Sequence, residues 1–568
     1  MKGAMKGAMK GTMTGALARG SALILLLATC TVGPTYHVPS APLPGTPSYK
    51  EARGAGPWRP ARPADAMLRG AWWRVFGEPE LDALEAQLRA GNQTIAQAVA
   101  NFTAARAVIR QAQAQYFPTV TTSPSVITGR SGGGGAALAG GLAPTGAGTT
   151  GAPGTTGTPG TTGTPGTTGT PGTTGPPGTT GTPGTTGTPG TTGTGTPGTA
   201  AAAAGGGGRF TSYSLPIDAA WAPDLFGRVR NTVRQAKYNA QVSAADLAGQ
   251  ELLAQATLAA TYFQLRGQDA LIDLLDATVA ADEQILALAR ARFETGIDTE
   301  LAVVQAEQTL QAARVQATGA AILRAQYEHA IATLVGRPAT AFSLPRRARR
   351  AAAPAIPTGA PSRLLERRPD IAAAERQMAA ASAAIGIGYA AYYPDLTLSG
   401  AAGLASSVIG SLLAWPSRVW SVGATLSETL FDGGLRRATI DQSIAAYDAT
   451  VAAYRQTVLA AFQQVEDALA QTRILAQQIE QQRRTVALAE RAFELERARY
   501  ETGIDPYIDL MQEQALLLAA RQTLVGLQVQ HMTSAVALVE ALGGGWDRAD
   551  LPSGQAARPP VSARTIWH

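Results

Sequence analysis

The chain has 568 residues, 15% of them charged and 6% aromatic, with a formal net charge of +6. Four of the positive charges, Lys2, Lys6, Lys10 and Arg19, precede residue 30, so the rest of the chain carries only +2. This near-neutral body argues against nucleic acid as a partner, because nucleic-acid-binding surfaces are strongly basic.

Residues 1–29 are predicted to be a lipoprotein signal peptide. The apolar run over 22–28 is too short to span a bilayer and follows a basic segment, as in secretory signals. Leu27-Ala28-Thr29-Cys30 resembles a lipobox, and Cys30 is the only cysteine of the chain. We therefore expect lipidation at Cys30 and an extended tether over 30–64. An ordinary signal peptide with a chance cysteine is the alternative, and the repeated Met-Lys-Gly start also allows Met13 as the true start.

The next segments alternate between two hydrophobic periods. A period near 3.6 from about 65 to 115 predicts helices, and we expect Trp72 and Trp73 to pack the N-terminal segment against them. Alternation of apolar and small polar residues predicts four strands, over 120–124, 213–221, 394–404 and 418–431. Such strands fit a membrane barrel, although soluble antiparallel sheets alternate in the same way.

Four strands cannot close a barrel around a lumen, and lipid tolerates no open sheet edge. If these strands span a membrane, several chains must therefore share one barrel. The strand pattern thus predicts an oligomer.

Two long helical patterns, roughly 224–292 and 435–499, would each form a rod of about 100 Å. Each ends at Glu-Thr-Gly-Ile-Asp and is followed by a shorter helical pattern, 299–334 or 507–542. Gly296 and Gly503 are predicted to adopt the left-handed conformation that ends a helix. Asp298 and Asp505 are predicted to cap the helices that follow. The chain should therefore form two antiparallel helical hairpins with these turns as tips.

The two tip sequences, at 293–298 and 500–505, lie 207 residues apart and indicate an internal duplication. Earlier matching segments lie 276 residues apart, and the difference is about the length of a Gly/Thr/Pro-rich tract. The predicted organisation is a signal peptide (1–29), a lipidated tether (30–64), a first repeat (65–345) with an insertion (130–208), a second repeat (346–545) and a C-terminal tail (546–568).

The insertion has glycine at every third position from Gly148 to Gly193. A disordered, hydrated extracellular loop is the favoured interpretation. A collagen-like triple helix and O-glycosylation of the threonines remain open alternatives.

Several motifs together resemble the TolC-like outer-membrane efflux factors, in the lipoprotein (NodT-type) branch that serves resistance-nodulation-division pumps. The motifs are CTVGPTYHVP at 30–39, Trp72-Trp73, ERRPDIAAAE at 366–375, YPDL at 393–396 and LFDGG at 430–434. The resemblance implies a mainly α-helical homotrimer. Its four strands per chain would form a twelve-stranded outer-membrane barrel, and its hairpins a hollow periplasmic tunnel. A periplasmic adaptor, an inner-membrane transporter of that pump class and outer-membrane lipid would be the partners.

The resemblance also implies that the tip of the second hairpin closes the tunnel at rest. Alignment on the tip sequence places this periplasmic gate near Ile508 and Gln512. Because the family commonly has aspartate where this chain has Gln512, Asp505 and Asp509 are alternative carriers of the gate's charge. Gly296, Asp298 and Gly503 at the tips would meet the adaptor.

Catalytic signatures are missing from the sequence. The four histidines lack metal-ligand spacing, and no nucleotide-binding loop or nucleophile elbow appears, so we expect neither enzyme activity nor a cofactor. The predicted function is a passive outlet that exports small toxic compounds or drugs. The alternatives are a type I protein-secretion outlet and a trimeric surface adhesin with collagen-like repeats.

Overall fold

The computed structural model of the chain describes residues 32–42, 49–51, 70–130, 209–347, 354, 356 and 364–552. The predicted signal peptide, Cys30, most of the insertion and the tail beyond residue 552 lie outside these ranges. The chain divides into two compact units. A helical unit comprises residues 1–117, 222–396 and 426–568, and a strand unit comprises residues 118–221 and 397–425.

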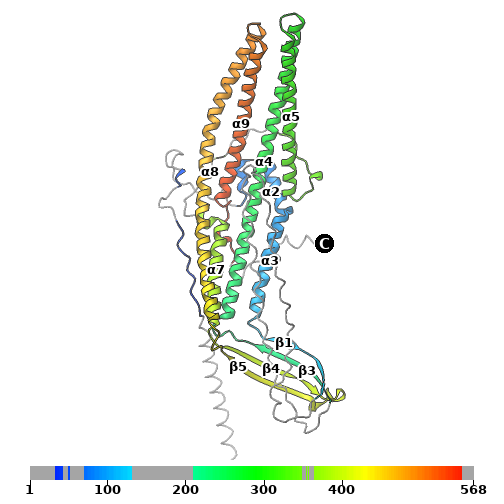
Figure 1. Ribbon diagram of the computed structural model, residues 1–568, viewed down its shortest axis with the longest axis vertical. Helices are drawn as coiled ribbons and strands as arrows, with labels where there is room; N and C mark the ends of the chain where they lie inside the picture. The colour runs from blue at the N-terminus through cyan, green and yellow to red at the C-terminus, as the bar shows by residue number, and fades with distance from the viewer. Residues whose placement is uncertain are drawn as a thin grey trace, which may run out of the picture. The chain divides into compact units, whose positions relative to one another are not determined.

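The helical unit contains two long hairpins and several shorter helices (Figure 1). Its helices are α2 (Pro79–Gly91), α3 (Gln93–Ala114), α4 (Arg228–Glu294), α5 (Glu300–Leu334), α6 (Leu364–Arg367), α7 (Pro369–Ala390), α8 (Leu435–Glu501) and α9 (Tyr507–Ala541), with single 3-10 turns at Trp72–Phe76, Ala339–Ala341 and Arg548–Asp550.

The hairpins α4–α5 and α8–α9 pack side by side through α4 and α9. Toward the other end of the unit, α4 packs on α3 and α7, and α8 packs on α7. Trp72 and Trp73 are 0% and 5% exposed and lie in a core with residues of α2, α4, α5 and α9, as predicted. The Nε1 group of Trp72 donates a hydrogen bond to the Gln255 side chain at 3.0 Å.

Helix lengths confirm the duplication. Helices α4 and α8 each have 67 residues, α5 and α9 each have 35, and α3 and α7 each have 22. The α4 and α8 termini are separated by the same 207 residues as the tip sequences, and those of α3 and α7 by the expected 276. Helix α7 starts at Pro369, whose fixed φ suits a first helical turn.

Equivalent glycines follow the C-terminal ends of the two shorter hairpin helices. Gly336 after α5 and Gly543 after α9 have φ of +74° and +92°. A Cβ at Gly336 would collide with the Gly91 carbonyl, and one at Gly543 with the Arg367 carbonyl. Gly91 and Arg367 are themselves 276 residues apart, so both repeats use the same close backbone contact.

The strand unit is one antiparallel sheet. Its strands are β1 (Thr119–Thr122), β2 (Ser125–Arg130), β3 (Arg209–Trp221), β4 (Asp395–Ser406) and β5 (Arg418–Ser427). The order is β1-β3-β4-β5, with β2 also pairing with β3. Because β1 and β2 follow one another along β3 in the same register, they act as one interrupted strand, and the four predicted strands are present. The last predicted strand ends at Ser427, before Leu430 and Phe431.

Within the described ranges, no helix combines the length and the apolar character that crossing a membrane requires.

Gly543→Ala should destabilise the protein by about 2 kcal/mol or more, because alanine disfavours positive φ and its Cβ would meet backbone. Thermal unfolding of the purified protein measures this. Gly526→Ala is the matched control in α9, where a Cβ meets no atom within 4 Å. There, alanine should raise stability by about 0.5–1 kcal/mol. Equal unfolding temperatures for the two variants would contradict the packing described for Gly543.

Candidate channel gate at the hairpin tips

Each long helix ends in a glycine turn. Gly296 and Gly503 have φ of +75° and +80°, the predicted left-handed conformation. Past each glycine, a backbone N–H returns to the helix: Ile297 to the Arg292 carbonyl and Ile504 to the Arg499 carbonyl, both at 2.9 Å. These bonds satisfy carbonyl groups that the helix end leaves free.

The predicted capping role of the two tip aspartates is wrong. The N-cap positions of α5 and α9 are Thr299 and Pro506, and neither makes a side-chain cap hydrogen bond. The carboxylates of Asp298 and Asp505 instead accept hydrogen bonds from the arginines six residues earlier, Arg292 and Arg499. An arginine that can reach back across the turn offers a charge-assisted bond, which is stronger than a bond from a neutral backbone N–H.

Asp298 also joins the first hairpin to the second. Its Oδ2 atom accepts from Arg292 Nε and from the Tyr500 hydroxyl, both at 2.8 Å. The Arg292 guanidinium lies 4.8 Å from the centre of the Tyr500 ring and donates to the Glu501 carbonyl at 3.2 Å. Burial and then the hydrogen bond to Asp298 raise the pKa of Tyr500, so its hydroxyl stays protonated and remains a donor. We call these contacts the tip junction.

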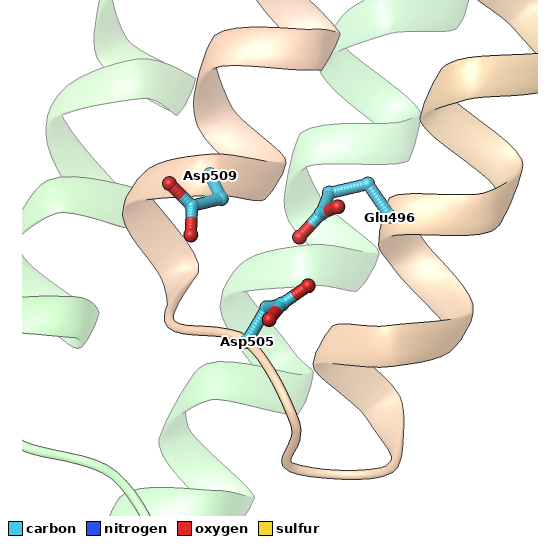
Figure 2. A group of neighbouring side chains, drawn as sticks. All are labelled: Glu496, Asp505 and Asp509. Atoms are coloured by element: carbon cyan, nitrogen blue, oxygen red, sulfur yellow. The ribbon is translucent and has the colours of Figure 1, made fainter.

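Three carboxylates gather at the second tip. Figure 2 shows Glu496 of α8 and Asp505 of the turn pointing toward each other, with Asp509 in the first turn of α9. One oxygen from each lies within 4.8 Å of the others. Desolvation and a hydrogen bond with Asp505 raise the pKa of Glu496, whereas the hydrogen bond from Arg499 lowers the pKa of Asp505. Arg499 therefore already supplies positive charge to this group.

The other residues predicted for the gate are on the same helix. Ile508 is 36% exposed, and Gln512, one turn further along α9, is also exposed. On another face of α9, Tyr507, Leu510 and Gln514 are buried against the first hairpin. Helix α9 thus turns one face to the neighbouring hairpin and leaves Ile508 and Gln512 free of it.

A buried polar pair lies behind the tip. Gln514 Nε2 on α9 donates to Asp282 Oδ1 on α4, and both side chains are buried. The remaining oxygens, Asp282 Oδ2 and Gln514 Oε1, have no partner among the described residues. Burial is the main cause that raises the pKa of Asp282 to about 6, and the Gln514 bond opposes it. Burial raises the pKa of the neighbouring Tyr507, and the charge of Asp282 adds to that rise.

Sequence reasoning missed Arg292, Tyr500, Asp282 and Gln514. Arg292 and Tyr500 could have been found from the sequence, because the repeated tip sequence extends back to Ala-Arg-Phe at 291–293 and Ala-Arg-Tyr at 498–500. Asp282 and Gln514 lie far apart in the sequence and have no counterpart in the duplication, so nothing in the linear pattern pairs them.

A model of the outer membrane efflux protein family matches residues 189–337 and 360–544, more than half of the chain. The chain belongs to the outer membrane efflux protein family. It is 30% identical over 337 residues to the probable efflux pump outer membrane protein SepC of Pseudomonas putida, covering 59% of this chain and 70% of that protein. It is 32% identical over 340 residues to the solvent efflux pump outer membrane protein SrpC of Pseudomonas putida, covering 59% and 72%.

Solved structures agree with this membership. The outer-membrane channel OprN matches with a TM-score of 0.72 and 26% identity, over 91% of this chain and all of that one. The open state of the Neisseria gonorrhoeae MtrE channel has the same fold, with a TM-score of 0.68 and 22% identity over 91% and 99%. The predicted fold class, with helical hairpins and strands of a trimeric barrel, is confirmed. The protein is an outer-membrane efflux channel that extends into the periplasm.

The glycine-rich insertion matches a second model, that of collagen triple helix repeats, over residues 143–204. These residues lie outside the described ranges. The adhesin alternative is set aside, because the second half of the chain contains the strands β4 and β5 and matches the efflux family over residues 360–544.

Asp282→Asn should remove a pH dependence of stability. The pKa of Asp282 in the folded protein, about 6, is above its usual value of 3.8. The folded protein therefore holds this proton more tightly, and the stabilisation is lost as pH rises through about 6. Asparagine remains neutral, so the variant should gain roughly 2–3 kcal/mol over wild type at pH 7.5 and little at pH 4. Thermal unfolding at both pH values measures the difference.

Glu283→Gln is the control, because that neighbouring carboxylate is 53% exposed and pairs with Arg314 on the surface. It should change stability little at either pH. If Asp282→Asn shifted the unfolding temperature equally at pH 4 and pH 7.5, the buried carboxyl would not titrate as described.

Proposed function

We propose that this channel is the outlet of a tripartite efflux system for small toxic compounds. A periplasmic adaptor and an inner-membrane resistance-nodulation-division transporter would be its partners, and passage through the channel itself would be passive and without catalysis. Its similarity to efflux-pump proteins supports this, because those relatives are named for solvent, toluene and antibiotic efflux. Another relative is named for pyoverdine export, so the cargoes named for these relatives are chemically varied.

We propose further that the hairpin tips form the periplasmic gate. The tip junction supports this, because Asp298 and Tyr500 belong to different hairpins and the second hairpin cannot swing away without separating them. Ile508 and Gln512, which α9 leaves exposed, would line the constriction. Gln512 is neutral, so Asp505 and Asp509 would supply the acidic charge nearest to it. Gly296, Asp298 and Gly503 at the tips would contact the adaptor.

Lipidation of Cys30 would hold the channel at the inner face of the outer membrane. The residues just after Cys30 are tied to the helical unit: Asn231 Nδ2 donates to the Val32 carbonyl at 3.1 Å, and the Tyr36 hydroxyl donates to Glu375 at 2.9 Å. An acyl chain at residue 30 would thus anchor a segment that is already docked. The insertion would form a surface loop outside this anchored body.

Cys30→Ser should abolish acylation, detected by loss of radioactive palmitate incorporation, while the hairpins still fold. Incorporation at wild-type level in the variant would contradict the assignment of Cys30.

Tyr500→Phe should weaken closure of the gate, because it removes one donor to Asp298 and leaves the ring in place. A net loss of about 1 kcal/mol would raise the open population roughly fivefold. Channels that carry Ile508→Ala or Asp509→Ala should likewise leak ions in the resting state. Single-channel recording in planar bilayers measures these effects.

The control is Tyr454→Phe, which removes a buried hydroxyl from the same helix about 70 Å from the tip. It should conduct like wild type. If each of the three single variants, Tyr500→Phe, Ile508→Ala and Asp509→Ala, kept the conductance of the closed channel, the assignment of the gate to the hairpin tips would be wrong.

Deletion of the gene tests whether the channel exports small toxic compounds or a protein. Cells without the channel should become sensitive to toluene-like solvents and antibiotics, and the wild-type gene should restore resistance. Unchanged resistance together with retention of a normally secreted protein would favour the type I secretion outlet.

A further inference from the structure

The strand unit carries a charge in the interior of one strand. The charged residues of β1–β5 are Arg130, Arg209, Asp218, Asp395 and Arg418. Four of them are the first or last residue of their strand, whereas Asp218 has nine residues of β3 before it and three after it. The position of Asp218 inside a strand therefore needs an explanation that the four charges at strand ends do not need.

The sheet has one apolar face, and Asp218 is on the other. Residues paired across neighbouring strands share a face, and successive residues alternate. Leu215 pairs with Leu404, and Trp221 with Leu398, so these four lie on one face. On β5, Trp420 and Val422 are 79% and 81% exposed and alternate with Ser421 and Gly423.

Asp218 is opposite Thr121 of β1 and Ala401 of β4. Both neighbours are small, and the next pair on this face, Pro216 with Gly403, is also without charge. The carboxylate has no ion pair or hydrogen bond to another residue within the described ranges. It is therefore an uncompensated negative charge on the polar face.

In an outer-membrane barrel the apolar face meets lipid and the polar face lines the lumen. A carboxylate on the lipid side would have to be desolvated, whereas in the lumen it remains hydrated. Asp218 therefore faces the lumen. Since the channel is a trimer, the same position occurs three times at one height of the barrel.

We propose that the three copies of Asp218 form a ring of carboxylates in the barrel lumen that favours the passage of cations, including positively charged toxic amphiphiles, over anions. The ring acts through its field, which reaches about one Debye length, roughly 8–10 Å, into the lumen at physiological ionic strength. It selects by charge and needs no contact with the cargo. The inference rests on the conduit function and concerns a charge of the strand unit, whereas the acidic residues proposed for the gate belong to the helical unit.

The test is the reversal potential of purified trimers in planar bilayers under a potassium chloride gradient. It is measured in the Tyr500→Phe background, so that the tips limit conduction less. Asp218→Asn should lower the ratio of potassium to chloride permeability roughly twofold or more, and Asp218→Lys should lower it further. Both effects should shrink at high salt, because ions screen the ring.

Asp395→Asn is the matched control, since it removes the same charge at a strand end where Arg228 already pairs with it at 3.2 Å. Asp218→Ser gives a second small neutral side chain in case asparagine impairs assembly, which size-exclusion chromatography reports. Unchanged permeability ratios in both Asp218→Ser and Asp218→Lys trimers would overturn the ring. If no trimer conducts in any background, the conduit function itself fails, and the ring with it.

Discussion

At the tips, the carboxylate of Asp298 links the first hairpin directly to the second. The Oδ2 atom of Asp298 accepts hydrogen bonds from both the Arg292 guanidinium and the Tyr500 hydroxyl. Each hairpin rod is about 100 Å long, so a small change of angle at its base becomes a large displacement at the tip. Apolar packing around Tyr500, Tyr507 and Leu510 brings the helices together, but only a directional polar contact fixes where the tips meet. That contact, together with the Gln514–Asp282 bond further along α9, places the proposed gate residues against the first hairpin.

The duplication explains both the regularity of the structure and its functional asymmetry. Equivalent helices have equal lengths, and equivalent glycines at 336 and 543 meet equivalent backbone. At the tips, however, Tyr500 corresponds to Phe293, which is 44% exposed and has no hydroxyl to donate. The Arg292–Asp298 pair is therefore covered by the second hairpin, whereas Arg499, at 56% exposure, remains open. The second repeat thus donates a hydrogen bond from Tyr500 to the first repeat, and the first repeat has no equivalent donor because Phe293 occupies that position.

Sequence patterns predicted the architecture well, because the constraints behind it are local or repetitive. Helical period, strand alternation and the tip glycines each depend on neighbouring residues, and the duplication allowed each prediction to be checked against its copy. The assignment of Asp298 and Asp505 as caps failed for the same reason. Capping is the usual local use of aspartate before a helix, but an arginine six residues earlier competes for the carboxylate more strongly.

The contacts between hairpins could not be read from the chain. Asp282 and Gln514 are 232 residues apart, and their pairing depends on how α4 and α9 are rotated against each other. Alanine-rich helices tolerate several such rotations, since small side chains give a weakly patterned surface. Asp218 was hidden for a different reason: one aspartate in an alternating strand looks ordinary until the cross-strand register shows which face it shares.

The most direct test of this account is the distance between the two tips, measured by electron-spin double resonance on the purified trimer. Spin labels at Thr295→Cys and Thr502→Cys, both exposed positions of equivalent turns, would be placed in a Cys30→Ser background. A narrow, short distance within the chain is predicted, which Asp298→Ala should broaden and lengthen. If Asp298→Ala left the distance distribution unchanged, the tip junction would not be what holds the two hairpins together.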